Sequence, residues 1–176
     1  EPYQPNQRGF AWFHGLLQGA RSYRPMANPT QHRIIQENGL ELPEAGYVTD
    51  RFGDAAARYV AEHAGEPFVC YLALHSVQDP FDPDPELLAS FEGKGGDPEF
   101  AATVAAVDRN MGRLRARLEG LGIDRQTTVL FTSDNGGGFI RNGPLRGGKG
   151  SVWEGGIRVP MVVSGPGVLT GTYCDQ

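Results

Sequence analysis

Asp134 and Asn135 stand between an apolar stretch and three consecutive glycines. A carboxylate next to a carboxamide offers hard oxygen ligands, which suit Ca²⁺ or Mg²⁺ better than zinc. The glycines allow the backbone to turn sharply and to approach a ligand closely. Asp-Asn-Gly is also typical of a simple turn, which is the better interpretation of this segment taken alone. Its position directly after a predicted buried strand makes a metal site and a turn equal interpretations.

A second segment with possible chemistry is the glycine-rich stretch 144–151, which contains Arg146 and Lys149. A lysine in such a loop can hold an anionic oxygen. A nucleotide phosphate loop is rejected, because Gly150 stands where that motif requires Ser or Thr. The alternative interpretation is a surface loop with a solvated lysine.

His75 and Gln78 form a third candidate, since they follow the apolar run 67–74. A histidine there could act as an acid, a base or a hydrogen-bond donor, although a lone histidine is more often only a hydrogen-bonded polar residue. The histidines at 14, 32 and 63 have no metal-ligand spacing to one another or to the cysteines. The sequence contains no G-x-S-x-G nucleophile motif.

Hydrophobic patterning predicts the elements that must position these residues. Apolar runs at 67–74, 127–132 and 159–164 predict strands, and 47–65 predicts a helix with Thr49 or Asp50 as its cap. Strand, long helix, strand is typical of an α/β fold with a mostly parallel sheet flanked by helices. Because ligands bind at the carboxyl ends of such strands, loops 75–80 and 133–138 are the expected site.

The long helix is predicted from Pro98 to Leu121, with Asp97 as its N-cap and Gly122 after its end. Its apolar stripe is expected to face the core. That stripe comprises Phe100, Val104, Val107, Met111, Leu114, Leu118 and Leu121. The opposite, solvated face is expected to carry Arg109, Arg113, Arg115, Arg117 and Glu119.

The composition limits the classes of protein to which this chain can belong. The 176 residues suffice for one domain with a core, and the net charge of -5 argues against a nucleic-acid partner. No apolar run is long enough to span a membrane. Cys70 is expected to be a buried small hydrophobe. Cys174 is the only other cysteine, and two cysteines neither require nor exclude a disulfide. Because the chain starts at Glu1 without a signal peptide, we expect an internal part of a longer protein.

Taken together, the motifs resemble the type I sulfatases of the alkaline phosphatase superfamily. The resemblance is ordered along nearly the whole chain and is most specific in its last block. The matching segments are Arg8-Gly9-Phe10, the aromatic-glycine region to Tyr23, 46–50 (GYVTD), 67–80 with its strand and loop, 132–137 (TSDNGG) and 145–160 (LRGGKGSVWEGGIRVP).

The resemblance implies an alkaline-phosphatase-like fold, of which residues 1–176 would be an incomplete part of one catalytic domain. It implies one divalent ion, usually Ca²⁺, ligated in part by Asp134 and Asn135, with Lys149 binding the sulfate group. A formylglycine made from Cys or Ser would attack sulfur, the logic of covalent catalysis. The substrate would be a small-molecule or glycan sulfate ester. The family is often exported, which implies a periplasmic or secreted protein; no oligomeric state is indicated.

Two positions depart from the family pattern. The formylglycine motif C-x-P-x-R or S-x-P-x-R does not occur in these 176 residues, so the nucleophile is expected upstream and the chain alone is expected to be inactive. The family's substrate-contacting histidine, two residues before a proline, is replaced by Gln78, with His75 three residues earlier. Glutamine can hydrogen-bond an ester oxygen but cannot act as a general acid. Two alternatives stay open: His75 could take the catalytic role of that histidine, or a different acid could serve the leaving group.

Two alternatives to a sulfatase remain open. One is a phosphomonoester or phosphonate-ester hydrolase of the same superfamily, which would share the metal and anion-binding residues. The other is a non-catalytic homologue that binds sulfated glycans; Gln78 motivates it, as do Trp12, Phe13 and Tyr23, which could stack on sugars or simply pack in the protein.

Overall fold

The computed structural model describes residues 4–138 and 142–173. The chain forms two compact units, an N-terminal unit, Glu1–Leu121, and a C-terminal unit, Gly122–Gln176. Within the described residues, no helix is both long enough and apolar enough to cross a membrane. Cys70 is half-buried, so the expected burial is found only in part, and this burial raises the pKa of its thiol. Cys174 lies outside the described residues.

The N-terminal unit begins with a small antiparallel sheet. Its strands are β1 (His14–Gly15), β2 (Gln36–Glu37) and β3 (Leu40–Glu41). One short 3₁₀ helix, Pro5–Gln7, precedes β1, and a second, Gln31–Arg33, lies between β1 and β2. His14 lies opposite Glu37, and Gln36 lies opposite Glu41. Asn38 and Gly39 join β2 to β3 with φ angles of 50° and 88°, which is the two-residue hairpin turn that Asn-Gly favours.

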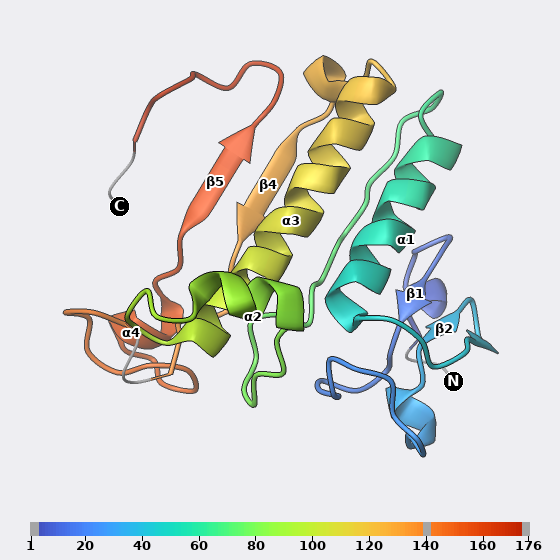
Figure 1. Ribbon diagram of the computed structural model, residues 1–176. Coiled ribbons are helices and arrows are strands. Elements are labelled where there is room, and N and C mark those ends of the chain that lie inside the picture. The colour runs from blue at the N-terminus through green and yellow to red at the C-terminus, as the bar shows by residue number, and fades with distance from the viewer. Residues whose placement is uncertain (1–3, 139–141, 174–176) are drawn as a thin grey trace. The chain divides into compact units, whose positions relative to one another are not determined.

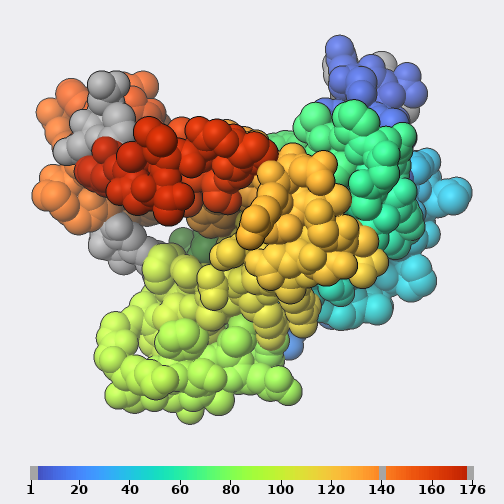
Figure 2. All heavy atoms as spheres, turned by 90° about the horizontal axis from the view of Figure 1, so that it is seen from above, coloured from blue at the N-terminus to red at the C-terminus, as the bar shows by residue number. Residues whose placement is uncertain are grey.

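Three helices complete this unit: α1 (Val48–Glu62), α2 (Pro85–Phe91) and α3 (Pro98–Gly120). The predicted start of α3 is confirmed, since the Asp97 carboxylate accepts a hydrogen bond from the Phe100 amide at 3.0 Å and Pro98 opens the helix. The predicted cap of α1 is wrong: Tyr47 occupies that position without a side-chain cap. Helices α1 and α3 pack side by side (Figure 1), and their adjoining ends are seen as spheres in Figure 2.

The buried face of α3 differs from the predicted apolar stripe. Val104 is 40% exposed, whereas Ala102, Thr103 and Asn110 are fully buried. The reason is close packing of helices through small side chains: a Cβ added at Gly53 of α1 would lie 2.7 Å from the Asn110 side-chain carbon Cγ. Val107 and Leu118 of the predicted stripe are buried. The prediction was therefore correct for the helix and for part of its core face, but missed the small and polar residues that are buried beside them.

Arg109 is not the solvated side chain that the sequence suggested. Its guanidinium bridges Asp50 of α1 at 2.7 Å and Asp84 at the start of α2 at 2.9 Å, and its side chain is 25% exposed. The neighbouring Asn110 donates to the same Asp50 carboxylate at 2.7 Å. The polar cluster ties the three helices together, which the one-dimensional pattern could not show.

Segment 67–74 is extended but belongs to no strand ladder among the described residues, so the predicted buried strand is only partly correct. Its side chains alternate. Leu72 and Leu74 pack against the core cluster of Ile35, Val48 and Phe52, whereas Val69 and Tyr71 are 81% and 77% exposed. Period-two alternation is the geometry of a strand with one covered face.

The C-terminal unit contains a 3₁₀ helix, Asp124–Gln126, strands β4 (Val129–Thr132) and β5 (Met161–Ser164), and the short helix α4 (Glu154–Ile157). Strands β4 and β5 pair antiparallel, with Val129 opposite Ser164. All ladders in residues 4–138 and 142–173 are antiparallel, so the parallel pairing expected from sequence is not among them. A parallel pair needs a crossover that returns the chain to the same end, and the loop between β4 and β5 instead reverses it.

Candidate active site

The residues predicted to hold a metal follow β4. Asp134 is exposed, and Asn135 is half-buried. The Ser133 hydroxyl donates to the backbone carbonyl of Asn135 at 2.8 Å, which fixes the turn locally. The strand therefore delivers a carboxylate and a carboxamide side by side at its carboxyl end, as the sequence predicted.

Loop 133–138 and loop 142–156 are joined by backbone hydrogen bonds. The Gly136 amide donates to the Gly156 carbonyl at 2.9 Å, and the Lys149 amide donates to the Gly137 carbonyl at 2.9 Å. The structure thus brings Lys149 to the loop that carries Asp134 and Asn135. Lys149 is exposed, on a backbone that is held by these hydrogen bonds.

Glycine is required where these loops touch. A Cβ added at Gly136 would overlap the Gly155 carbonyl and lie 2.8 Å from its carbon. A Cβ at Gly155 would lie 2.7 Å from the Arg146 carbonyl oxygen, and one at Gly156 would lie 2.6 Å from that of Gly148. The glycines therefore allow backbone to pack directly on backbone.

Asn142 was not singled out from sequence, yet its side chain links both loops. Its Nδ2 donates to the carbonyls of Gly137 at 2.9 Å, Gly138 at 3.0 Å and Gly147 at 3.0 Å. An asparagine among glycines is so typical of a turn that no local pattern signals this role. The Arg146 guanidinium lies 3.5 Å from the Trp153 ring centroid, so this cation packs on an aromatic ring.

The donor set at this end of β4 fits a hard cation only in part. Asp134 and Asn135 contribute oxygen ligands of the kind that Ca²⁺ takes. Within the described residues, however, no three His, Cys, Asp or Glu side chains are grouped so that they could hold an ion. The C-terminal unit therefore offers two neighbouring ligands, and a complete shell needs further oxygen donors.

His75 and Gln78 lie in the N-terminal unit, on the loop that follows segment 67–74. The His75 ring packs against the Tyr23 ring at a centroid distance of 4.7 Å. Burial lowers the pKa of His75, and a hydrogen bond to the Arg21 backbone opposes this only in part. The neutral imidazole therefore already contacts the Tyr23 ring and the Arg21 backbone. The Gln78 carboxamide donates to the Asp79 carbonyl at 3.2 Å.

The aromatic residues considered for sugar stacking are packed within the protein. Tyr23 is 1% exposed, so it cannot stack on a ligand. Trp12 and Phe13 are half-buried, and the Trp12 ring stacks on Tyr59 with centroids 5.3 Å apart. The packing interpretation is the correct one for Tyr23 and Trp12.

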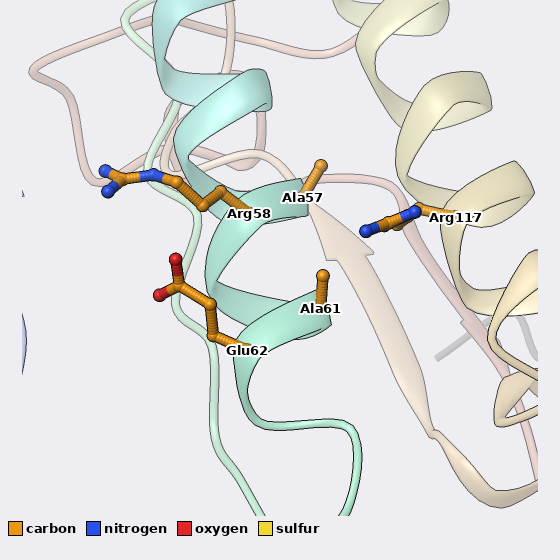
Figure 3. A pocket seen from close by; sticks show the side chains of 5 residues that line it. All are labelled: Ala57, Arg58, Ala61, Glu62 and Arg117. Atoms are coloured by element: carbon orange, nitrogen blue, oxygen red, sulfur yellow. The ribbon is translucent and has the colours of Figure 1, made fainter.

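A shallow hollow of about 380 Å³ lies on the N-terminal unit between α1 and α3. Figure 3 shows its lining, which comprises Ala57, Arg58, Ala61, Glu62 and Arg117. None of the predicted site residues lines this hollow. Arg58 is already bound to Glu37, and this ion pair lowers the pKa of Glu37 to about 2.

The comparison with protein families decides the relationship, because the family model described as Sulfatase matches residues 2–172. The chain belongs to the sulfatase family. It is 37% identical over 142 residues to a protein named Sulfatase from Formosa agariphila, covering 70% of this chain and 26% of that protein. It is 36% identical over 136 residues to the Steryl-sulfatase of Mus musculus, covering 71% of this chain and 21% of that protein.

Solved structures agree with the family. The structure titled Ps i-CgsB in complex with k-i-k-neocarrahexaose has a TM-score of 0.86 and 32% identity, covering 94% of this chain and 42% of that chain. The sulfatase PsFucS1 from Pseudoalteromonas sp. has a TM-score of 0.61 and 26% identity, covering 76% of this chain and 29% of that chain. The similarity confirms the alkaline-phosphatase-like α/β fold expected from sequence. The chain spans about a quarter of the curated relatives' length.

Proposed function

We propose that the full-length protein hydrolyses sulfate esters. The observation that carries this proposal is the pair of interlocked loops in the C-terminal unit. One loop carries Lys149, a cation that can bind an anionic group, and the other carries the oxygen ligands Asp134 and Asn135. The backbone hydrogen bond of 2.9 Å from Lys149 to Gly137 holds the two loops together. A divalent ion and a lysine are the groups that stabilise the charge of a transferring sulfuryl group.

In this proposal Asp134 and Asn135 are two of the ligands of a divalent cation, with Ca²⁺ as the best match to their hard oxygens. When bound, that ion supplies Lewis-acid stabilisation of the substrate's non-bridging oxygens. Lys149 holds the sulfate group by charge. The nucleophile is a formylglycine outside these 176 residues, since the motif from which it is made does not occur in them. Both compact units belong to one catalytic domain.

Gln78 contacts the bridging ester oxygen of the substrate in this scheme, and His75 supports the loop. His75 is a poor candidate for the leaving-group acid, because its ring packs on Tyr23 and burial lowers the pKa of the imidazole. Gln78 can donate a hydrogen bond to the ester oxygen without transferring a proton. The leaving alcohol therefore departs with hydrogen-bond assistance, or takes its proton from a group beyond these residues.

The substrate class that we propose is a sulfated glycan. Ps i-CgsB, whose title names a complex with a neocarrahexaose, is similar to 94% of this chain at a TM-score of 0.86, against 0.61 for PsFucS1. The similarity spans both compact units. We expect the full-length protein to act on an oligosaccharide sulfate in preference to a free sulfated sterol.

The decisive assay measures sulfate release by the full-length protein from a sulfated galactan oligosaccharide, beside phosphate release from a matched phosphate monoester. We expect sulfate release that Lys149→Ala reduces at least about a hundredfold, the scale of losing one preorganised charge at a reacting group. Lys94→Ala is the matched control, because Lys94 is the only other lysine in these 176 residues, lies in an exposed loop and contacts Phe91.

Each other outcome identifies an alternative. Faster phosphate than sulfate release would favour the phosphohydrolase. Tight oligosaccharide binding without turnover would favour the non-catalytic homologue. An unchanged rate in Lys149→Ala would show that this lysine does not bind the sulfate group.

A further inference from the structure

Gln78 is held at both of its backbone polar groups by a single side chain. The Tyr23 hydroxyl donates to the Gln78 carbonyl at 2.9 Å and accepts from the Gln78 amide at 2.9 Å. The two residues are 55 positions apart in the sequence. The same phenol hydroxyl therefore acts as donor and as acceptor toward a single residue, and this fixes both the location and the orientation of that peptide segment.

Tyr23 is itself immobilised. It is 1% exposed, its ring stacks on Tyr47 with centroids 5.6 Å apart, and the tilted His75 ring packs against it at a centroid distance of 4.7 Å. The Val48 amide donates to the Tyr23 carbonyl at 2.8 Å. Burial raises the pKa of the Tyr23 phenol, so the phenol keeps its proton and remains a donor at neutral pH.

A second buried contact holds the same loop. The Thr49 hydroxyl lies 2.5 Å from the Ser76 hydroxyl, and Thr49 is 0% exposed. Thr49 is in the first turn of α1, next to Val48, to which the Tyr23 backbone is bound. The loop from His75 to Pro80 thus rests on two rigid supports, one through Ser76 and one through Gln78.

We propose that Tyr23 is the positioning residue that sets where the Gln78 side chain meets the substrate's ester oxygen. The proposal rests on the proposed function in one respect, that Gln78 contacts the substrate. Tyr23 is enclosed by Tyr47 and His75 and does not touch the substrate. Its action passes through the Gln78 backbone, so a displaced peptide would misplace the carboxamide, and misplacement by a fraction of an ångström weakens a transition-state hydrogen bond.

The test is a double-mutant cycle in the full-length protein, with Tyr23→Phe, Gln78→Ala and the double variant. Tyr23→Phe keeps the ring packing and removes both hydrogen bonds. We expect Tyr23→Phe to lower kcat about tenfold, the scale of one lost hydrogen bond, with KM little changed. We expect no further loss when it is added to Gln78→Ala, because the residue through which it acts is gone.

A second readout separates positioning from loss of stability. The kcat loss in Tyr23→Phe should be larger for a glycan sulfate than for an activated aryl sulfate, because a good leaving group needs less help at its bridging oxygen. Tyr47→Phe is the matched control. It also removes a buried phenol hydroxyl, but that hydroxyl makes no hydrogen bond of standard geometry among the described residues. Tyr47→Phe should leave kcat for both substrates unchanged.

If Tyr23→Phe does not fold, Ser76→Ala tests the same idea, because it removes the contact of this loop with Thr49. Ser76→Ala should lower kcat by a smaller factor than Tyr23→Phe. It should cause no further loss when it is added to Gln78→Ala. Multiplicative losses in the cycle, or an unchanged kcat in Tyr23→Phe, would overturn the proposal. If Gln78→Ala has no effect, Gln78 does not contact the substrate and the proposal falls, whereas Lys149→Ala still tests the sulfatase activity separately.

Discussion

The backbone amide of Lys149 donates a hydrogen bond of 2.9 Å to the carbonyl of Gly137. This bond makes loops 133–138 and 142–156 parts of one structure, so the position of the proposed sulfate-binding lysine depends on the turn that carries the proposed metal ligands. The Asn142 amide strengthens the same junction by donating to carbonyls of both loops. Changes at this junction should therefore affect both functions together.

Asn142→Asp should weaken the junction without changing the size of the side chain. The carboxylate oxygen that replaces Nδ2 would face the three carbonyl oxygens of Gly137, Gly138 and Gly147 with no hydrogen to share. The loss of these hydrogen bonds, together with the repulsion between the oxygens, should lower the free energy of unfolding by about 2 kcal/mol. We expect a lower Tm of the full-length protein, weaker Ca²⁺ binding by calorimetry, and reduced sulfate release.

Asn38→Asp is the matched control for that substitution. The Asn38 Oδ1 accepts hydrogen bonds from the Phe13 amide at 2.9 Å and the Asn6 side chain at 3.1 Å, and an aspartate oxygen can accept both. Its free energy of unfolding should stay within about 1 kcal/mol of the native value, so its Tm should change little. An equal loss in the two variants would show that the Asn142 amide has no special role.

Gly136→Ala should disrupt the contact between the loops by sterics alone. The added methyl group would overlap the Gly155 carbonyl, and backbone cannot move aside as a flexible side chain does. The expected loss of stability is about 3 kcal/mol. Gly138→Ala is the control for Tm, because a Cβ there meets nothing within 4 Å. Thermal unfolding of both variants measures the difference, and equal Tm values would contradict the close approach.

The sequence revealed those features that depend on local chemistry. Asp97 and Pro98 predicted the start of α3, because a side-chain cap and a proline act on the nearest backbone groups. The ordered motif around Lys149 predicted the family, which the family model confirms. The buried face of α3 was predicted only in part: Val107 and Leu118 are buried as expected, but the close approach of α1 buries small side chains such as Ala102 and leaves Val104 exposed. Apolar spacing gives no account of the partner helix.

Long-range polar contacts were the other features missed. Tyr23 and Gln78 are 55 residues apart, and nothing in either local sequence indicates their paired hydrogen bonds. Arg109 was assigned to the solvated face because arginines are usually exposed there. Its partner Asp84 lies before α2 and enters the same cluster only through the packing of α2 on α3.

Arg109→Ala should destabilise the full-length protein far more than Arg113→Ala. Loss of Arg109 leaves the Asp50 and Asp84 carboxylates, 22% and 19% exposed, without their shared partner, which should cost about 2 kcal/mol. Arg113 is 49% exposed and 3.5 Å from Asp50, so its removal should cost under about 0.5 kcal/mol. Urea unfolding of the two variants checks the order, and the reverse order would refute the assigned roles.

Gln78→His should add a proton-donating group at the position where the sulfatase resemblance has a histidine. Glutamine does not titrate, so Gln78 does not itself make kcat of the native protein depend on pH. In Gln78→His, kcat for a glycan sulfate should rise below a pH of about 6.5, where an unperturbed imidazole is protonated. Gln78→Asn is the non-titrating control. Superimposable pH profiles for the native protein and Gln78→His would show that this position does not face the leaving group.

His75 should make the stability of the N-terminal unit depend on pH. Burial lowers the pKa of its imidazole below the ordinary value of 6.5, with the Tyr23 ring and the Arg21 backbone as its neighbours. As pH falls through 6.5, the unfolded chain binds a proton that the folded chain does not, so the free energy of unfolding decreases, down to the lowered pKa of the folded state. Above pH 7 this contribution is constant.

Urea unfolding of the full-length protein at pH 8 and pH 5.5 measures this contribution as a difference between variants. His75→Asn removes the titrating group, so it should lose less stability between the two pH values than the native protein, whatever its absolute stability. Burial also lowers the pKa of His14, so His14→Asn should reduce the slope in the same direction. His32→Asn controls for removing an exposed histidine. An unchanged slope in His75→Asn would mean that the imidazole has the same pKa in the folded and the unfolded protein, and would contradict the lowering of that pKa by burial.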